Sequence, residues 1–180
     1  MRISRAHVVN FRCIGDLEVD FDDVTVLVGA NGTGKSSVLH ALAWFFNGGN
    51  LIGEDISGHR VGETVTVGVT FTDFDEADKE ALGSYVLGDE ATFWRTWSED
   101  DGAKLTGRGL AYPDFARVRA HEKATPKRTA YNELRDQQPD LGLPKAGSAA
   151  AVDEALSQWE ADHSDRLTEA RTDAPTCSGS

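Results

Sequence analysis

The residues with the clearest chemical role lie between Gly29 and Ser36, where the sequence reads Gly-Ala-Asn-Gly-Thr-Gly-Lys-Ser. This order fits the phosphate-binding pattern G-x-x-x-x-G-K-[S/T]. A nucleoside triphosphate brings about four negative charges, and the successive backbone N–H groups of a glycine-rich loop can point inward at them. The spacing therefore predicts a loop that binds the phosphates of a nucleotide.

Each position of this loop has a predicted role. Glycine lets the backbone approach the phosphates and adopts positive φ at little cost. Lys35 would place a positive charge at the β- and γ-phosphates, and the Ser36 hydroxyl is placed to ligate Mg²⁺. The predicted cofactor-binding residues are Gly29, Ala30, Asn31, Gly32, Thr33, Gly34, Lys35, Ser36 and Ser37, with Ser36 as the metal ligand.

The segments on both sides of the loop favour an α/β fold of the P-loop NTPase class. Val24–Val28 is a continuous, mostly β-branched apolar run, which is typical of a strand buried on both faces. Residues 35–46 are apolar nearly all round, which predicts a buried helix. The loop would therefore join a buried strand to a buried helix, as the pattern requires.

The rest of the chain predicts a mixed sheet around the P-loop helix and a helical last third. Strands are expected at 3–9, 16–21 and 63–71, a helix at 75–86, and a hairpin joining 92–97 to 103–105 through Asp101-Gly102. A late apolar stripe predicts helix packing at Val152, Ala155, Leu156 and Trp159. We expect a P-loop lobe at 1–110, a helical segment at 111–171 and a disordered tail at 172–180, with no further strand of central-sheet quality beyond Pro113.

Composition narrows the classes of function. The 180 residues carry a net charge of −12 and only two cysteines, Cys13 and Cys177, which we expect to be ordinary thiols. The absence of a long apolar run or a signal-like N-terminus predicts a cytoplasmic protein without a membrane partner. The overall charge disfavours nucleic acid, yet residues 104–135 hold eight basic against three acidic side chains. This basic stretch, 104–135, is either a DNA or protein contact or a solvated face.

Hydrolysis needs a carboxylate that holds Mg²⁺ and activates water, normally after a second apolar strand. Asp73, Glu18 and Asp20 are the nearest candidates, but none follows a run of aliphatic residues, so we expect all three to be surface acids. Residues 55–58 resemble the D-x-x-G of GTPases, although no guanine-reading motif follows. Catalytic residues are therefore left unassigned.

Asn10-Phe11-Arg12 between two strands, followed by the P-loop and Ser37, resembles the N-terminal part of ABC-type ATPase heads of the SMC and RecF group. Residues 67–74, 93–97 and 131–135 resemble the OLD family of ATP-dependent endonucleases. The resemblance implies ATP and Mg²⁺ as cofactors, Arg12 near the nucleotide, dimerisation of the head, DNA as a partner of the full-length protein, and a role in genome defence or repair.

The same resemblance implies elements that have no counterpart in this sequence: a Walker B Asp-Glu, a Leu-Ser-Gly-Gly signature, a switch His and a Toprim nuclease domain. The first hypothesis is therefore the N-terminal part of an OLD-like ATPase with little activity alone. A self-contained P-loop phosphotransferase, with lid arginines among Arg117, Arg119 and Arg128, is the second hypothesis. A non-catalytic, nucleotide-dependent interaction module is the third.

Overall fold

The computed structural model describes residues 1–57, 63–121 and 123–174. The chain divides into two compact units. The first contains Met1–Arg108 and the chain from Asp173 onward, and the second contains Gly109–Thr172. None of the helices in the described ranges is both long and apolar enough to cross a membrane.

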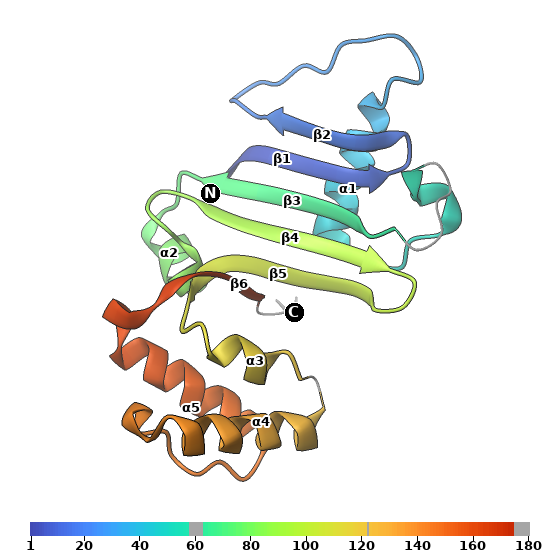
Figure 1. The fold of residues 1–180 in the computed structure, drawn as a ribbon. Coiled ribbons are helices and arrows are strands. Elements are labelled where there is room, and N and C mark those ends of the chain that lie inside the picture. The colour runs from blue at the N-terminus through green and yellow to red at the C-terminus, as the bar shows by residue number, and fades with distance from the viewer. Residues whose placement is uncertain (58–62, 122, 175–180) are drawn as a thin grey trace. The chain divides into compact units, whose positions relative to one another are not determined.

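A sheet with the strand order β2-β1-β3-β4-β5-β6 forms the framework of the fold (Figure 1). The strand pairs β1–β2, β1–β3, β3–β4 and β4–β5 are antiparallel. The expected pair of N-terminal strands and the hairpin through Asp101-Gly102 are confirmed. The strands are β1 (Arg2–Phe11), β2 (Ile14–Asp20), β3 (Val65–Thr72), β4 (Ala91–Ser98), β5 (Gly102–Ala111) and β6 (Thr168–Asp173).

Helix α1 (Lys35–Asn47) lies on one face of this sheet and contacts β1 and β3 (Figure 1). Its buried side chains join valines of β3 and aromatic residues of β4 in one core. At the far end of the helix, Arg95 of β4 donates from Nε to the Phe45 carbonyl over 2.8 Å. A cation there complements the helix dipole. The core residues that α1 contributes are Val38, Ala41, Trp44 and Phe45.

The prediction that α1 is buried all round is wrong. Leu39 is 62% exposed and Phe46 is 55% exposed, whereas Val38 and Ala41 are almost fully buried. Only the side of the helix that faces the sheet is covered by described residues. An apolar composition therefore did not distinguish a helix covered on both sides from one covered on a single side.

The predicted buried strand at Val24–Val28 is also wrong. Val24, Val26 and Val28 are 82%, 72% and 85% exposed, and the segment is not among the strands of the described sheet. It lies in the loop that leads from β2 to α1 (Figure 1). Of its residues, only Leu27 packs against the core. A β-branched run becomes a buried strand only where neighbouring strands pair with it. Without this segment, the parallel member of the expected mixed sheet is missing from the described strands.

Two short segments link the strands of the first unit. η1 (Gly53–Asp55) follows α1, and α2 (Glu76–Leu82) with η3 (Gly83–Tyr85) follows β3. Asp75 caps α2 by accepting a hydrogen bond from the Asp78 amide over 2.8 Å. The predicted helix at 75–86 is therefore confirmed in its first half and ends at Leu82, where Gly83 has a φ of 51°.

The second unit is helical and has its own core, as the stripe near its end predicts. Val152, Leu156 and Trp159 of α5 are buried against Tyr131 and Leu134 of α4. The buried polar atoms are satisfied, since the Trp159 indole and the Tyr131 hydroxyl each donate to a backbone carbonyl over 2.7 Å. The elements are α3 (Phe115–Arg119), α4 (Ala124–Gln137), η4 (Pro139–Leu141), α5 (Ala149–Asp162) and η5 (Ser164–Arg166).

Strand β6 overturns one expectation about the end of the chain. It is an edge strand without a buried residue, so it does not contradict the expectation of no further central strand, but it extends to Asp173, although we expected the disordered tail to begin at Thr172. The Ala174 amide donates to the Leu105 carbonyl over 3.1 Å, and the Ala174 side chain is buried. The remaining residues of the predicted tail, 175–180, including Cys177, lie outside the described residues.

The exposure of Val26 can be tested by comparing it with a buried valine. Val26→Thr should change the free energy of unfolding by less than about 0.5 kcal/mol, as surface substitutions usually do. Val67→Thr places a hydroxyl in the core, where Val67 is 0% exposed, and should cost about 1–3 kcal/mol. Urea unfolding followed by tryptophan fluorescence measures both. Equal losses at the two positions would contradict the exposed placement of Val26.

Candidate functional site

The predicted phosphate-binding loop is an open turn in front of α1. Residues 29–33 are exposed, while Gly34 is buried where the helix begins. Gly32 and Gly34 have φ angles of 82° and 99°, a region that glycine adopts far more readily than other residues. The loop therefore depends on glycine at these two positions, and it presents its outer side to solvent.

Lys35 closes this loop on itself. Its ammonium donates to the carbonyls of Gly29 and Ala30 over 2.8 and 2.6 Å. The Thr33 hydroxyl also donates to the Ala30 carbonyl, over 2.9 Å. An ammonium has three donors and no acceptor, so Lys35 can bind both carbonyls at once and link the two ends of the loop. It also places a positive charge inside the loop.

The first turn of α1 has no cap of its own. Its N-cap residue, Gly34, supplies no side-chain hydrogen bond, and the turn contains no acidic residue. By contrast, Ser148 caps α5 by accepting from the Ala151 amide over 3.1 Å. Uncapped amides and the positive end of the helix dipole favour an anion at this position. The Ser36 hydroxyl lies on the exposed side of the same turn, and Ser37 is buried.

The turn between β1 and β2 contacts the end of the phosphate-binding loop and the first turn of α1. Cys13 Sγ lies 3.3 Å from the Ser37 hydroxyl. A Cβ atom added at Gly34 would lie 3.4 Å from Cys13 Sγ and 3.5 Å from Ile14. Cys13 is therefore a packing partner of the phosphate loop, which its sequence context did not indicate.

Arg12, which the family resemblance places near the nucleotide, forms an ion pair in this structure. Its Nε donates to Asp55 Oδ1 over 2.9 Å, and its backbone amide donates to the Asp55 carbonyl over 2.8 Å. The guanidinium also lies 5.5 Å from the centre of the Phe11 ring. Asp55 was singled out only as part of a weak D-x-x-G match, so its contact with Arg12 was missed.

The three acidic residues considered for a second metal ligand lie elsewhere. Arg5 pairs with Asp20 over 2.9 Å and with Glu18 over 3.7 Å, and Arg2 pairs with Asp73 over 2.8 Å. All three carboxylates are exposed, as predicted for surface acids. Within the described residues, no group of three or more His, Cys, Asp or Glu side chains could hold a metal ion.

Much of the basic stretch 104–135 is neutralised locally. In the second unit, Arg119 forms a two-bonded pair with Glu160 over 3.0 and 2.8 Å, and Lys127 pairs with Asp153 over 2.6 Å. Lys104 of the first unit pairs with Asp101 over 3.4 Å. These contacts favour the solvated-face interpretation for the residues concerned, since each positive charge already has a carboxylate partner.

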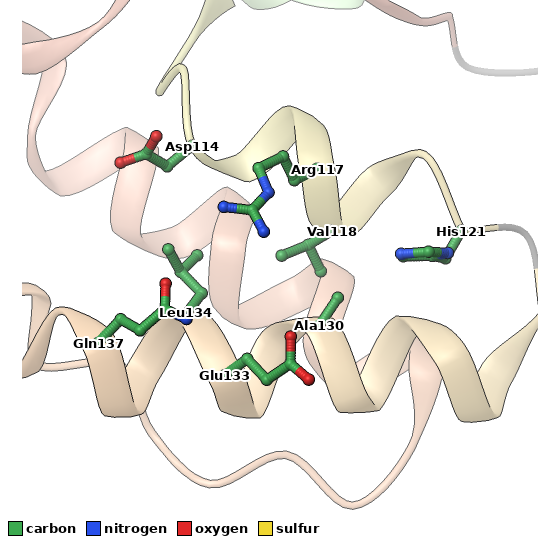
Figure 2. A pocket seen from close by; sticks show the side chains of 8 residues that line it. All are labelled: Asp114, Arg117, Val118, His121, Ala130, Glu133, Leu134 and Gln137. Carbon is green, nitrogen blue, oxygen red and sulfur yellow. The ribbon is translucent and has the colours of Figure 1, made fainter.

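A small pocket of about 80 Å³ lies between α3 and α4 of the second unit (Figure 2). Arg117 from α3 and Glu133 from α4 bring opposite charges to it, so it does not favour a strongly charged ligand. Glu133 and Leu134 belong to the segment 131–135 that resembles the OLD family, and Arg117 is one of the lid arginines of the phosphotransferase hypothesis. The lining residues are Asp114, Arg117, Val118, His121, Ala130, Glu133, Leu134 and Gln137.

Comparison with known proteins identifies the unit that holds the loop. A family model described as AAA ATPase domain matches residues 1–108. A DNA double-strand break repair Rad50 ATPase from Halobacterium salinarum (strain ATCC 700922 / JCM 11081 / NRC-1) is 37% identical over 86 residues. That match covers 47% of this chain and 9% of the Rad50 protein. This chain therefore spans less than a tenth of the length of that relative.

Two solved structures are also similar, at low identity. One is an SMC ATPase from work on ATP-driven dimerization and DNA-stimulated activation, with 21% identity and a TM-score of 0.44. The match covers 61% of this chain and 70% of the other. The second is the recombination mediator protein RecF with ATP, with 16% identity and a TM-score of 0.45. It covers 91% of this chain and 52% of the other.

The requirement for glycine at position 34 can be tested by comparing its replacement with that of Gly15 in β2. Gly34→Ala should destabilise the protein by about 1–2 kcal/mol, because alanine is strained at positive φ. Gly15 has no neighbour within 4 Å of an added Cβ and no positive φ, so Gly15→Ala should change stability by less than about 1 kcal/mol. Urea unfolding measures both variants. Equal effects would show that the left-handed conformation of Gly34 is not required.

Proposed function

Because this chain belongs to the AAA ATPase domain family, we propose that it binds ATP with Mg²⁺ at residues 29–37. The observation that carries the proposal is the ammonium of Lys35, which lies in the loop directly before the uncapped turn of α1. A positive charge, free amides and a hydroxyl at Ser36 are the groups that a triphosphate with its metal ion requires.

Binding would exchange the internal contacts of the loop for contacts with the ligand. Lys35 would leave the carbonyls of Gly29 and Ala30, to which it now donates, and donate to phosphate oxygens. The amides of residues 32–37 would supply further donors, as in other P-loops. Ser36 would hold Mg²⁺, which neutralises phosphate charge when bound. Arg12 would add positive charge near the phosphates while it stays paired with Asp55.

We propose that binding is accompanied by little hydrolysis in this chain alone. The three carboxylates that could follow a second apolar strand are exposed and paired with arginines of β1. Hydrolysis needs a carboxylate that orients water beside the metal ion. We therefore assign the chain as the N-terminal, nucleotide-binding part of a DNA-linked ATPase, which a further segment or a second head would complete.

Exposed apolar residues near the nucleotide site support the proposal that a further segment or a second head completes it. Val24, Val26 and Val28 before the loop and Leu39 and Phe46 on α1 are exposed on segments that directly flank the nucleotide site. We propose that these segments contribute to a docking surface. Dimerisation of the head and contact with DNA belong to the same proposal. Both are properties of the larger protein.

We propose in addition that the larger protein is a nuclease of the OLD type. The segments that resemble that family provide core residues here, including Val67, Val69, Phe93 and Tyr131. Their similarity is therefore explained by packing as well as by common function. Nuclease activity would come from a Toprim domain outside these 180 residues, so it can be tested only in the protein that contains such a domain.

The phosphotransferase hypothesis has less support, since Arg119 is held by Glu160 and Arg117 lines the small pocket of the second unit. A non-catalytic interaction module is the remaining alternative. It predicts the same binding without turnover. Nucleotide-dependent association of the chain with a partner, measured by sedimentation with and without ATP, would favour it if the partner is not an ATPase head.

Lys35→Ala is the direct test of the phosphate loop. ATP affinity in Mg²⁺, measured by calorimetry, should fall at least about tenfold, because loss of a charge-assisted hydrogen bond costs about 1.5–3 kcal/mol. Lys79→Ala is the matched control, since Lys79 is a half-exposed lysine of the same unit that pairs with Glu76. Equal affinity in the wild type and Lys35→Ala would refute the proposed site, and rapid turnover by the wild type would refute its incompleteness.

Ser36→Ala tests the metal ligand separately from the phosphate contacts. The variant should weaken ATP binding severalfold in Mg²⁺ and leave the weaker binding in EDTA unchanged, because the hydroxyl acts through the metal ion. Ser4→Ala provides a serine control on β1, where the hydroxyl donates to the Thr70 carbonyl over 3.3 Å. An equal loss in EDTA and in Mg²⁺ would show that Ser36 does not act through the metal ion.

A further inference from the structure

The turn between β1 and β2 contacts two segments that are distant in the sequence. On one side, Cys13 packs against Gly34 and Ser37 at the start of α1. On the other side, Arg12 pairs with Asp55 at the end of η1. Two adjacent residues of one turn therefore connect the phosphate loop to η1.

Asp55 holds this turn with several groups at once. Its Oδ1 accepts from Arg12 Nε over 2.9 Å, its carbonyl accepts from the Arg12 amide over 2.8 Å, and its Oδ2 accepts from the Ile52 amide over 3.3 Å. The Asp55 side chain is only 17% exposed. Next to this pair, Phe11 forms an isolated antiparallel bridge with Ile56. The carboxylate thus ties η1 and the turn into one structure.

The backbone of the turn needs such support. Arg12 has a φ of 52° and Asn10 a φ of 57°. Residues other than glycine rarely adopt this region, and they remain there only where surrounding contacts fix them. The hydrogen bonds that Asp55 accepts from the backbone and side chain of Arg12 are contacts of this kind. Weakening them would let the turn relax, and Cys13 would move with it.

We propose that Asp55 is a positioning residue of the nucleotide site. It acts through Arg12 and the adjacent Cys13, which contacts Gly34 and Ser37, and it does not touch the nucleotide itself. The inference rests on the proposed function, because it assumes that ATP binds at residues 29–37. Since coupling between two sites is reciprocal, bound ATP should in turn stabilise the contact between Arg12 and Asp55.

Asp55→Asn tests this inference, since asparagine keeps the shape of the side chain and removes its charge. Asp20→Asn is the matched control, because Asp20 pairs with Arg5 over 2.9 Å at the other end of the same hairpin. ATP affinity should fall about two- to thirtyfold in Asp55→Asn, the range of couplings measured between sites. It should stay within the error of the wild type in Asp20→Asn.

A second measurement needs no nucleotide. Hydrogen exchange of the amides of residues 34–38, where the Val38 amide donates to the Gly34 carbonyl over 3.0 Å, should accelerate in Asp55→Asn and not in Asp20→Asn. Arg12→Gln should accelerate the same amides, and the double variant should add little, because both residues act through one contact. If the wild type binds no ATP, the proposed function fails while this exchange measurement still decides the coupling.

Two results would overturn the inference. Unchanged exchange at residues 34–38 in a folded Asp55→Asn variant would show that the phosphate loop is independent of η1. Tighter ATP binding in this variant would show that Asp55 withholds Arg12 from the phosphates and does not position the loop. Circular dichroism and urea unfolding establish that each variant is folded before either result is interpreted.

Discussion

The phosphate loop depends on the burial of one face of α1 against the sheet. Val38, Ala41, Trp44 and Phe45 lose their contact with water there, and burial of apolar area is the main favourable term in folding. This contact fixes the axis of the helix, and the axis fixes where its first amides and Lys35 lie. Arg95 secures the opposite end through the Phe45 carbonyl. The chemistry at one end of the helix therefore rests on packing along its whole length.

Each of the two units has its own hydrophobic core and its own ion pairs. The first has a sheet, one covering helix and a chain of exposed ion pairs along β1. The second encloses its own aromatic core, in which Trp159 stacks on His163 at 4.2 Å between ring centres and Arg166 lies over Trp159 at 5.2 Å. Its ion pairs, such as that between Arg119 and Glu160, close within the unit. The family match ends at residue 108, where the first unit gives way to the second.

Local patterns in the sequence predicted the elements whose signals are local. The hairpin through Asp101-Gly102, the helix after Lys35 and the stripe of α5 follow from turn chemistry and from periodicity. Val24–Val28 could not be predicted, since the burial of a β-branched run depends on partners that the run does not specify. β6 reads Thr-Glu-Ala-Arg-Thr-Asp, which has no apolar alternation. The contact of Arg12 with Asp55 spans 43 positions and leaves no pattern in either segment.

The exposed valines before the loop have a consequence for the life of the protein in a cell. An exposed aliphatic segment is the kind of surface that chaperones and proteases recognise on incompletely folded chains. Val24–Val28 presents such a surface in an otherwise packed unit. Under the proposed docking on this segment, the amount of the chain in a cell should follow how long the segment stays uncovered as well as the stability of the fold. Quality control would then remove copies whose segment is not covered.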